Sequence, residues 1–303
     1  MKRTPMTMLP LGIPPTLAIL LGASVWGVIW YPLRLLAALG VSGTLASAVT
    51  SAVGCLCVMA LRYRALASLR WHWALPLLGL ASGVANLGYM WGAIHGEVMR
   101  VLLLFYLTPA WTALFAHFIL HERLTVAGIL LALLALTGAA LMLYSPAAGV
   151  PLPANLAEWA GVAGGMGFAL NNVLSVKTVQ VLPQMKPEMR TVVIFGGAAI
   201  FSAVAACFEP MVAPPTGLRL TWAALLSLGL GSVLAGTNLV VQAGMVRVRA
   251  NRASIVMLFE LVVTALTAWW LAHEAPGPRE WAGGACIVLA SILSGWVHRS
   301  ARD

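Results

Sequence analysis

The chain is dominated by apolar runs of about twenty residues, each separated from the next by a short polar or Pro/Gly-containing break. A helix of that length is roughly 30 Å long, which matches the hydrocarbon thickness of a bilayer. Of the 303 residues, 61% are hydrophobic and 9% are charged, so a soluble fold would lack the polar residues needed to cover its surface. The sequence therefore predicts an all-α membrane protein that crosses the bilayer many times.

Ten such runs are recognisable, and the basic residues orient them. With both termini in the cytoplasm, fourteen Lys and Arg residues fall on the inner side, and only Arg34, Arg100, Arg219 and Arg279 fall on the outer side. The net charge of +9 is therefore a topology signal. It does not indicate nucleic-acid binding, because the basic residues do not gather in a patch. The expected spans are 15–39, 44–61, 73–94, 98–120, 125–144, 156–180, 191–208, 219–243, 252–272 and 280–297.

The two halves of the chain echo each other. A proline-rich break at 145–155 separates two sets of five spans. A shift of 152 residues carries Asn86 onto Asn238 and the His-Glu pair at 121–122 onto the pair at 273–274, which indicates an internal duplication. Since five is odd, the second copy enters the membrane from the opposite side, as in the inverted repeats of many secondary transporters. The two five-helix repeats are expected at 1–146 and 147–303.

Glu260 is the only acidic residue expected deep within any of the ten spans. It lies about 12 Å along its helix, where an ionisable group is costly unless it faces a bundle interior or a watery cavity. Two interpretations stand at this point. Glu260 either binds a substrate amine or exchanges a proton during transport, or it is a protonated carboxyl that donates one hydrogen bond to a neighbouring helix.

Asparagines within spans carry a similar ambiguity, because an intramembrane amide serves either helix packing or solute binding. Asn86 and Asn238 occupy equivalent positions in the two repeats, which suits a shared packing role. The Asn171-Asn172 pair has no obvious counterpart in the first span, so it ranks higher as a lining of a central cavity. Spans five and ten are almost purely apolar and are expected at the lipid-facing periphery.

Aromatic residues deep within spans either pack in the core or against lipid, or form a wall for a flat or amphipathic solute. Pro109 removes a backbone hydrogen bond inside span four, so a kink or break is expected there that could act as a hinge. The expected substrate-contacting residues, including the deep aromatics, are Trp26, Trp30, Asn86, Tyr89, Tyr106, Trp111, Asn171, Asn172, Asn238 and Glu260.

Several chemistries are disfavoured by what the sequence lacks. Asp occurs only at Asp303, no GxxxxGK[ST] loop is present, and the four cysteines match neither a redox nor a metal-ligand spacing. We therefore expect no metal, no cofactor and no enzymatic activity. A membrane-embedded lipid-modifying enzyme would need ionisable groups clustered at one interface, whereas the two His-Glu pairs are expected on opposite sides. A membrane scaffold without transport activity is a third alternative.

Three short motifs carry a resemblance to a known family. They are Thr108-Pro109-Ala110, Phe259-Glu260-Leu261 and the His-Glu pairs that close spans four and nine. With ten spans in two halves, the chain resembles the tandem EamA-type domains of the drug/metabolite transporter superfamily. That family usually has Glu-Pro in the fourth helix of a repeat and Gly-Glu at its end. The departures here leave open whether span nine bends.

The resemblance implies a central cavity lined by spans one to four and six to nine. The deep aromatics are most similar to those of bacterial aromatic amino acid exporters. The resemblance thus implies a multi-pass secondary transporter of the bacterial inner membrane, which exports aromatic or other neutral amino acids by alternating access, as a monomer or homodimer. Export of other small metabolites or drugs is the alternative within the superfamily.

Overall fold

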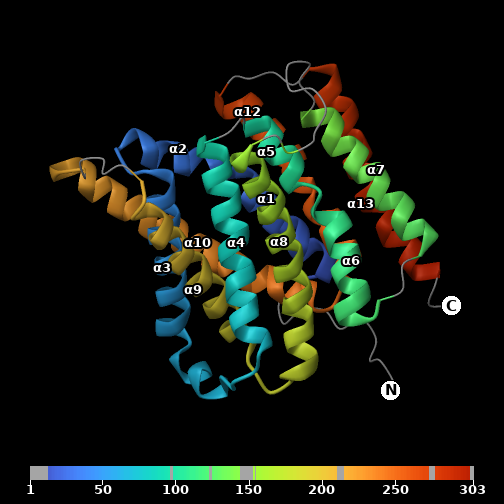
Figure 1. Cartoon of the computed structure of the whole chain (residues 1–303), viewed down its shortest axis with the longest axis horizontal. Helices are drawn as coiled ribbons and strands as arrows, with labels where there is room; N and C mark the ends of the chain where they lie inside the picture. Colours follow the sequence, from blue (N-terminus) through green and yellow to red (C-terminus); the bar gives the residue numbers. More distant parts are fainter. Residues whose placement is uncertain are drawn as a thin grey trace.

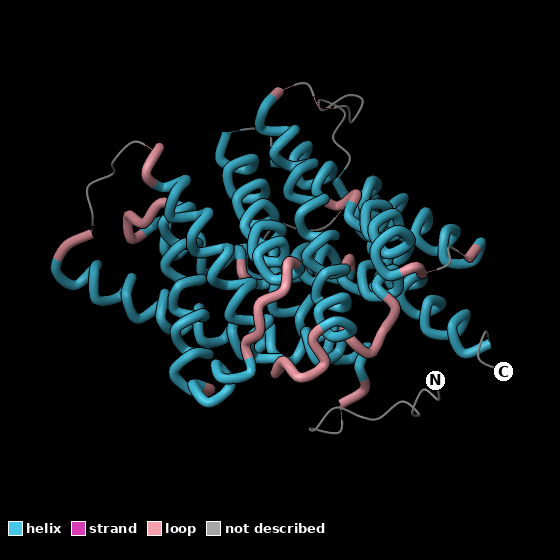
Figure 2. Tube along the Cα trace, turned by 60° about the horizontal axis from the view of Figure 1, so that its bottom comes forward, coloured by secondary structure: helices cyan, strands magenta, loops and turns pink. Residues whose placement is uncertain are grey.

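The computed structural model describes residues 13–95, 98–122, 125–143, 153, 155–209, 215–272 and 277–300. Within these residues the ordered elements are helices only, which confirms the all-α prediction (Figures 1 and 2). The helices are α1 (Pro15–Val28), α2 (Trp30–Ala38), α3 (Gly43–Leu61), the 3₁₀ helix η1 (Tyr63–Ser68), α4 (Ala74–His95), α5 (Val98–Phe105), α6 (Thr108–Leu120), α7 (Val126–Leu143), α8 (Leu156–Val181), α9 (Pro187–Ala206), α10 (Gly217–Met245), α11 (Ala250–Met257), α12 (Phe259–Ala272) and α13 (Pro278–Ser300).

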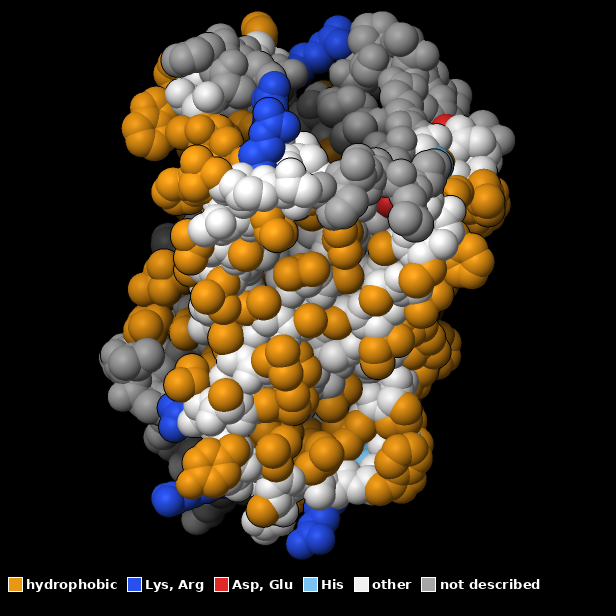
Figure 3. Space-filling model, turned by 90° about the vertical axis from the view of Figure 1, so that its left-hand side faces the viewer, with side chains coloured by type: hydrophobic (Ala, Val, Ile, Leu, Met, Phe, Trp, Pro, Cys, Tyr) orange, Lys and Arg blue, Asp and Glu red, His pale blue; other side chains and the backbone are white. Residues whose placement is uncertain are grey.

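The surface and the helix lengths suit a bilayer. Figure 3 shows apolar side chains spread over the middle of one face, with Lys and Arg side chains near its two ends. Five described segments are long and apolar enough to cross a membrane, and the expected number of ten crossings stays a prediction. The termini, 1–12 and 301–303, lie outside the described residues. The five segments are Pro15–Ala38, Gly43–Leu61, Pro187–Ala206, Gly217–Met245 and Arg252–Leu271.

Three helical stretches are interrupted near their middle. Ile29 separates α1 from α2, a turn at 106–107 separates α5 from α6, and Leu258 separates α11 from α12. Pro109 lies in the first turn of α6, where its missing N–H removes no helical hydrogen bond. The shift of 152 residues superposes the second break on the third, although Leu261 stands where the first repeat has Pro109. Span nine is therefore broken without a proline.

Packing between the two halves is pairwise symmetric. α4 packs on α8 as α10 packs on α1, and α4 packs on α9 as α10 packs on α3. Likewise α5 and α6 pack on α8, while α11 and α12 pack on α1. Two further pairs, α3 with α9 and α7 with α13, join equivalent helices. α7 and α13 lie together at one edge of the bundle in Figure 1, the peripheral place expected for spans five and ten.

Glycines on α8 and α4 bring three helices into backbone contact. A Cβ atom at Gly88 would lie 2.7 Å from the Cα of Gly164, and one at Gly161 would lie 2.8 Å from the carbonyl oxygen of Val101. Such distances leave no room for a side chain, so only glycine permits this approach. α4 and α5 are thereby held close to α8, and their aromatic side chains are held close to each other.

We expect Gly88→Leu to destabilise the protein, because the new side chain must separate α4 from α8. Overpacking of this kind costs roughly 1–3 kcal/mol. The matched control is Gly236→Leu, since Gly236 is exposed on α10 and has open space around its Cβ position. Thermal unfolding of the detergent-purified variants measures the difference. Equal melting temperatures for the two variants would contradict the close packing of α4 on α8.

Candidate functional site

Five aromatic side chains from α1, α4, α5, α8 and the turn after α5 form one continuous aromatic cluster. The ring centroids of Trp26 and Phe168 are 6.4 Å apart, and those of Phe168 and Phe105 are 5.7 Å apart. Phe105 in turn contacts Tyr89 at 5.5 Å and Tyr106 at 5.6 Å, both edge to face. Three members were expected as site residues. The two phenylalanines were missed, because nothing in the sequence separates them from lipid-facing phenylalanines.

The carboxyl group of Glu260 adjoins this cluster. The Tyr106 hydroxyl is its hydrogen-bonding partner, and Tyr89 lies within electrostatic range of the same carboxyl. Because the chain breaks at Leu258, Glu260 lies in the first turn of α12, where unpaired backbone N–H groups favour a negative charge. A Cβ atom at Gly27 would lie 2.8 Å from the carbonyl oxygen of Glu260, so α1 passes directly beside it.

The two neighbouring asparagines of α8 are placed differently. Asn172 is 1% exposed, and its Nδ2 donates to the sulfur of Met257 at 3.8 Å. Met257 belongs to an apolar group against which Trp26 and Phe168 pack, so Asn172 lies near the aromatic cluster. Asn171 is also buried, and its Oδ1 has no hydrogen-bond partner among the described residues. A buried acceptor without a donor is costly, so Asn171 offers a hydrogen bond to a ligand.

Asn86 and Asn238 tie helices together outside the aromatic cluster. Asn86 Oδ1 accepts hydrogen bonds from the hydroxyls of Ser47 at 2.5 Å and Ser202 at 2.8 Å. Asn238 Oδ1 accepts one from the hydroxyl of Thr191 at 3.1 Å. In both repeats the donors come from α3 or α9, which are equivalent helices. These contacts favour the packing interpretation for both asparagines.

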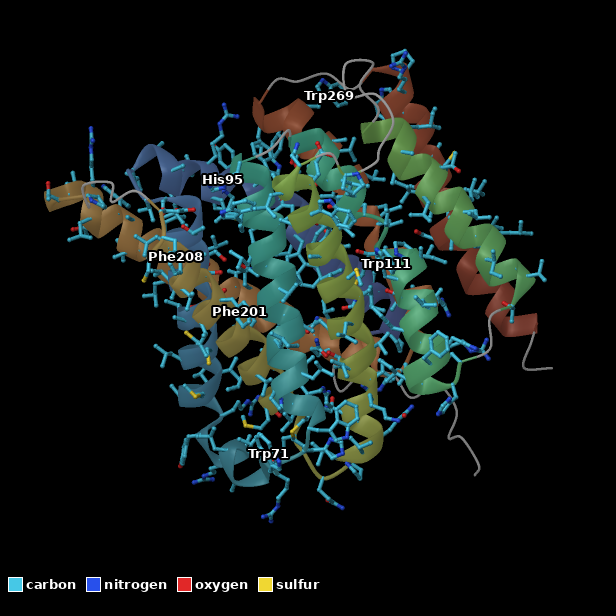
Figure 4. The ribbon with its side chains drawn as sticks, viewed as in Figure 1. Trp71, His95, Trp111, Phe201, Phe208 and Trp269 are labelled. Carbon is cyan, nitrogen blue, oxygen red and sulfur yellow. The ribbon has the colours of Figure 1, made fainter. Side chains whose placement is uncertain are left out.

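Two further expected site residues make contacts elsewhere. Trp30 lies at the start of α2, where its indole N–H donates to Thr267 Oγ1 at 3.1 Å and its ring packs on Tyr31. Trp111 lies on α6, which packs beside α8 (Figure 4). Its indole nitrogen is buried and has no hydrogen-bond partner among the described residues. The structure therefore gathers Trp26, Tyr89 and Tyr106 but not these two tryptophans.

The arrangement suits recognition of a protonated amine attached to an apolar group. Glu260 presents acceptor oxygens, and the aromatic rings present an apolar surface whose faces attract cations. Among the described residues no three His, Cys, Asp or Glu side chains come together as a possible metal site. The carboxyl group of Glu260 can bind a cation or exchange a proton at this position.

Comparisons with known proteins concern the whole chain. The family model described as the EamA-like transporter family matches it twice in tandem, over residues 14–144 and 155–296. No curated protein matches the chain significantly. A solved structure described simply as the crystal structure of a protein is similar over 95% of this chain and 99% of that chain, with a TM-score of 0.77 and 22% sequence identity. At this identity the likeness shows the fold alone.

We expect Asn86→Ala and Asn238→Ala to lower stability, since the first removes the acceptor of the Ser47 and Ser202 hydroxyls and the second removes that of the Thr191 hydroxyl. The loss is about 1 kcal/mol for each, as for other hydrogen bonds between membrane helices. Asn171→Ala is the matched control, because it removes an oxygen that has no partner. Its melting temperature in detergent should equal that of the wild type. A larger loss for Asn171→Ala than for Asn86→Ala would reverse the two assignments.

Proposed function

Because this chain belongs to the EamA-like transporter family, we propose that it exports amino acids, aromatic or other neutral ones, across the bacterial inner membrane. Transport itself is the general activity of the family. The substrate, the direction and the membrane are our proposal, supported by one observation above all. An intramembrane carboxyl group adjoins a cluster of aromatic side chains contributed by both halves of the chain.

The energetics support a binding role for Glu260. A carboxylate at bilayer depth costs about 2.5–3.5 kcal/mol or more, so its presence calls for a compensating partner. The hydroxyl of Tyr106 and the first turn of α12 supply part of that compensation. A substrate ammonium group supplies the remainder, and the rings of Trp26 and Phe168 accommodate an aromatic or aliphatic side chain.

The symmetric packing supports alternating access between inverted halves, 1–146 and 147–303. With the expected ten crossings both termini lie on the same side of the membrane, and the distribution of basic residues favours the cytoplasmic side. The fourth expected span of each half is broken, and the fragments α6 and α11 contact each other. Rocking one half against the other then opens the site to each side of the membrane in turn. One chain supplies the whole cluster, so a homodimer would contain two complete sites.

A second candidate substrate class is favoured by a specific feature of the cluster. Among the described residues, the groups that interact electrostatically with Glu260, Tyr89 and Tyr106 are these three residues themselves, and no Lys or Arg that could pair with a substrate carboxylate is among them. Organic amines, whether metabolites or drugs, therefore satisfy the same site. Comparing phenylalanine with 2-phenylethylamine as transported solutes distinguishes the two classes.

We expect Glu260→Gln to reduce transport about tenfold or more, because it replaces a charge-assisted hydrogen bond with a neutral one. Asn171→Ala should reduce it several-fold, since one of about two polar contacts is lost. Uptake of labelled phenylalanine into proteoliposomes with matched protein content measures both. Glu209→Gln, at the end of α9 and hydrogen-bonded to Thr44, is the matched control. If Glu260→Gln and Asn171→Ala both retain full transport, the polar site is wrongly assigned.

A further inference from the structure

A second polar group lies where α9 begins and α10 ends, away from the aromatic cluster. Arg190 is the fourth residue of α9, and its side chain is 2% exposed. Its Nε has no hydrogen-bond partner among the described residues. A guanidinium group remains charged in proteins, so burying one of its N–H donors without an acceptor is unfavourable. This position therefore calls for an anionic ligand.

The charges around Arg190 do not supply that anion. Glu188, the acidic residue within electrostatic range, is in an ion pair with Arg62, with 3.7 Å between Oε1 and Nε. Arg247 is the other charged neighbour and adds a further positive charge, its guanidinium donating to the carbonyl oxygen of Ala243 at 2.6 Å. The first-turn N–H groups of α9 also favour an anion. Positive charge at this end of α9 is therefore in excess.

Gln242 provides a complementary group on the facing helix. It is 2% exposed, and its Oε1 has no hydrogen-bond partner among the described residues. The hydrogen bond from Thr191 to Asn238 fixes the register of α9 and α10, which run in opposite directions. Arg190 precedes Thr191, and Gln242 follows Asn238 by about one turn. Both residues therefore lie toward the same end of the bundle from that bond, Arg190 with a donor nitrogen and Gln242 with an acceptor oxygen that are unpaired among the described residues.

We propose that Arg190 and Gln242 form a second solute site, the inner-end site, which binds the carboxylate and ammonium groups of a zwitterionic amino acid. This inference rests on the proposed function and specifies its substrate class. A phosphate or carboxylate alone would satisfy Arg190 but leave the acceptor of Gln242 unpaired. An amino acid, whose two charged groups are adjacent, satisfies both.

The depth of the inner-end site gives it a separate role from Glu260. Arg190 lies about 5 Å along α9, whereas Glu260 lies about 15 Å beyond the start of α11, and both helices start at the same end of the bundle. In the proposed orientation that end is cytoplasmic. The inner-end site then holds the amino acid before it reaches the aromatic cluster, and it supplies the cationic contact that the cluster lacks.

Thermal shifts of the purified protein with three ligands test this assignment. The ligands are phenylalanine, 3-phenylpropanoate and 2-phenylethylamine, which carry both charges, the carboxylate alone and the ammonium alone. We expect Arg190→Gln to lower the affinity for phenylalanine and 3-phenylpropanoate about tenfold or more. The affinity for 2-phenylethylamine should stay unchanged. Gln242→Leu should lower the affinity for phenylalanine several-fold and leave the affinity for 3-phenylpropanoate unchanged. Arg249→Gln, an exposed position at the start of α11, is the matched control and should behave as the wild type.

Other outcomes overturn the assignment. Wild-type affinity for all three ligands in Arg190→Gln would make Arg190 structural. If that variant does not fold, Arg190→Lys keeps the charge but loses the planar fork, and it should show an intermediate affinity. Phosphatidylglycerol in the bilayer is compared with its absence for the wild type and for Arg190→Gln. If the lipid stabilises only the wild type, and both proteins bind phenylalanine with equal affinity, the site belongs to a lipid phosphate.

The failure of this proposal is distinguishable from the failure of the proposed function. If wild-type protein moves no phenylalanine in proteoliposomes, the proposed function fails. If wild-type transport is intact, Glu260→Gln is impaired and Arg190→Gln transports like Arg249→Gln, only the inner-end site fails. Absence of any thermal response of the wild type to the three ligands contradicts both.

Discussion

The structure depends on how one carboxyl group is accommodated at bilayer depth. A continuous helix would leave Glu260 among apolar side chains with its backbone N–H groups already bonded. The break at Leu258 instead creates a new helix start at that level, where the positive end of the helix dipole favours the charge. The broken helix of the other half supplies the Tyr106 hydroxyl, and Gly27 admits α1 at the same level. The polar site therefore arises from the backbone as much as from side chains.

Features that the two halves share belong to the helix packing, whereas the features in which they differ lie beside the aromatic cluster. Both halves have a central break in the fourth span, and both tie an asparagine of the third span to a hydroxyl of α3 or α9. These shared features hold the frame together. At the equivalent break positions, however, one half has Thr108 and the other Glu260. At this position only the second half carries an ionisable side chain beside the aromatic cluster.

The sequence was sufficient to predict helices and to single out Glu260 as a candidate, because apolar length and an isolated charge within an apolar run are strong local signals. It did not predict the break at Leu258, because no proline or glycine marks this position. The fragments α11 and α12 on either side of the break pack on α1 and α13, and such tertiary contacts are not visible in the sequence. Phe105 and Phe168 were missed because a phenylalanine within an apolar span can contact lipid or line a site, and the sequence does not distinguish the two. Arg190 was assigned to topology alone, because burial of a charge near a span end depends on the neighbouring helices.

The most direct test of the account is a structure of the protein with bound 2-phenylethylamine, a probe with one ammonium group and one ring. The account predicts the ammonium group within hydrogen-bonding distance of the Glu260 carboxyl and the ring against Trp26, Phe105 or Phe168. Ligand bound elsewhere in the bundle, with the Glu260 carboxyl still hydrogen-bonded to Tyr106, would contradict the assignment of this carboxyl as the substrate-binding group.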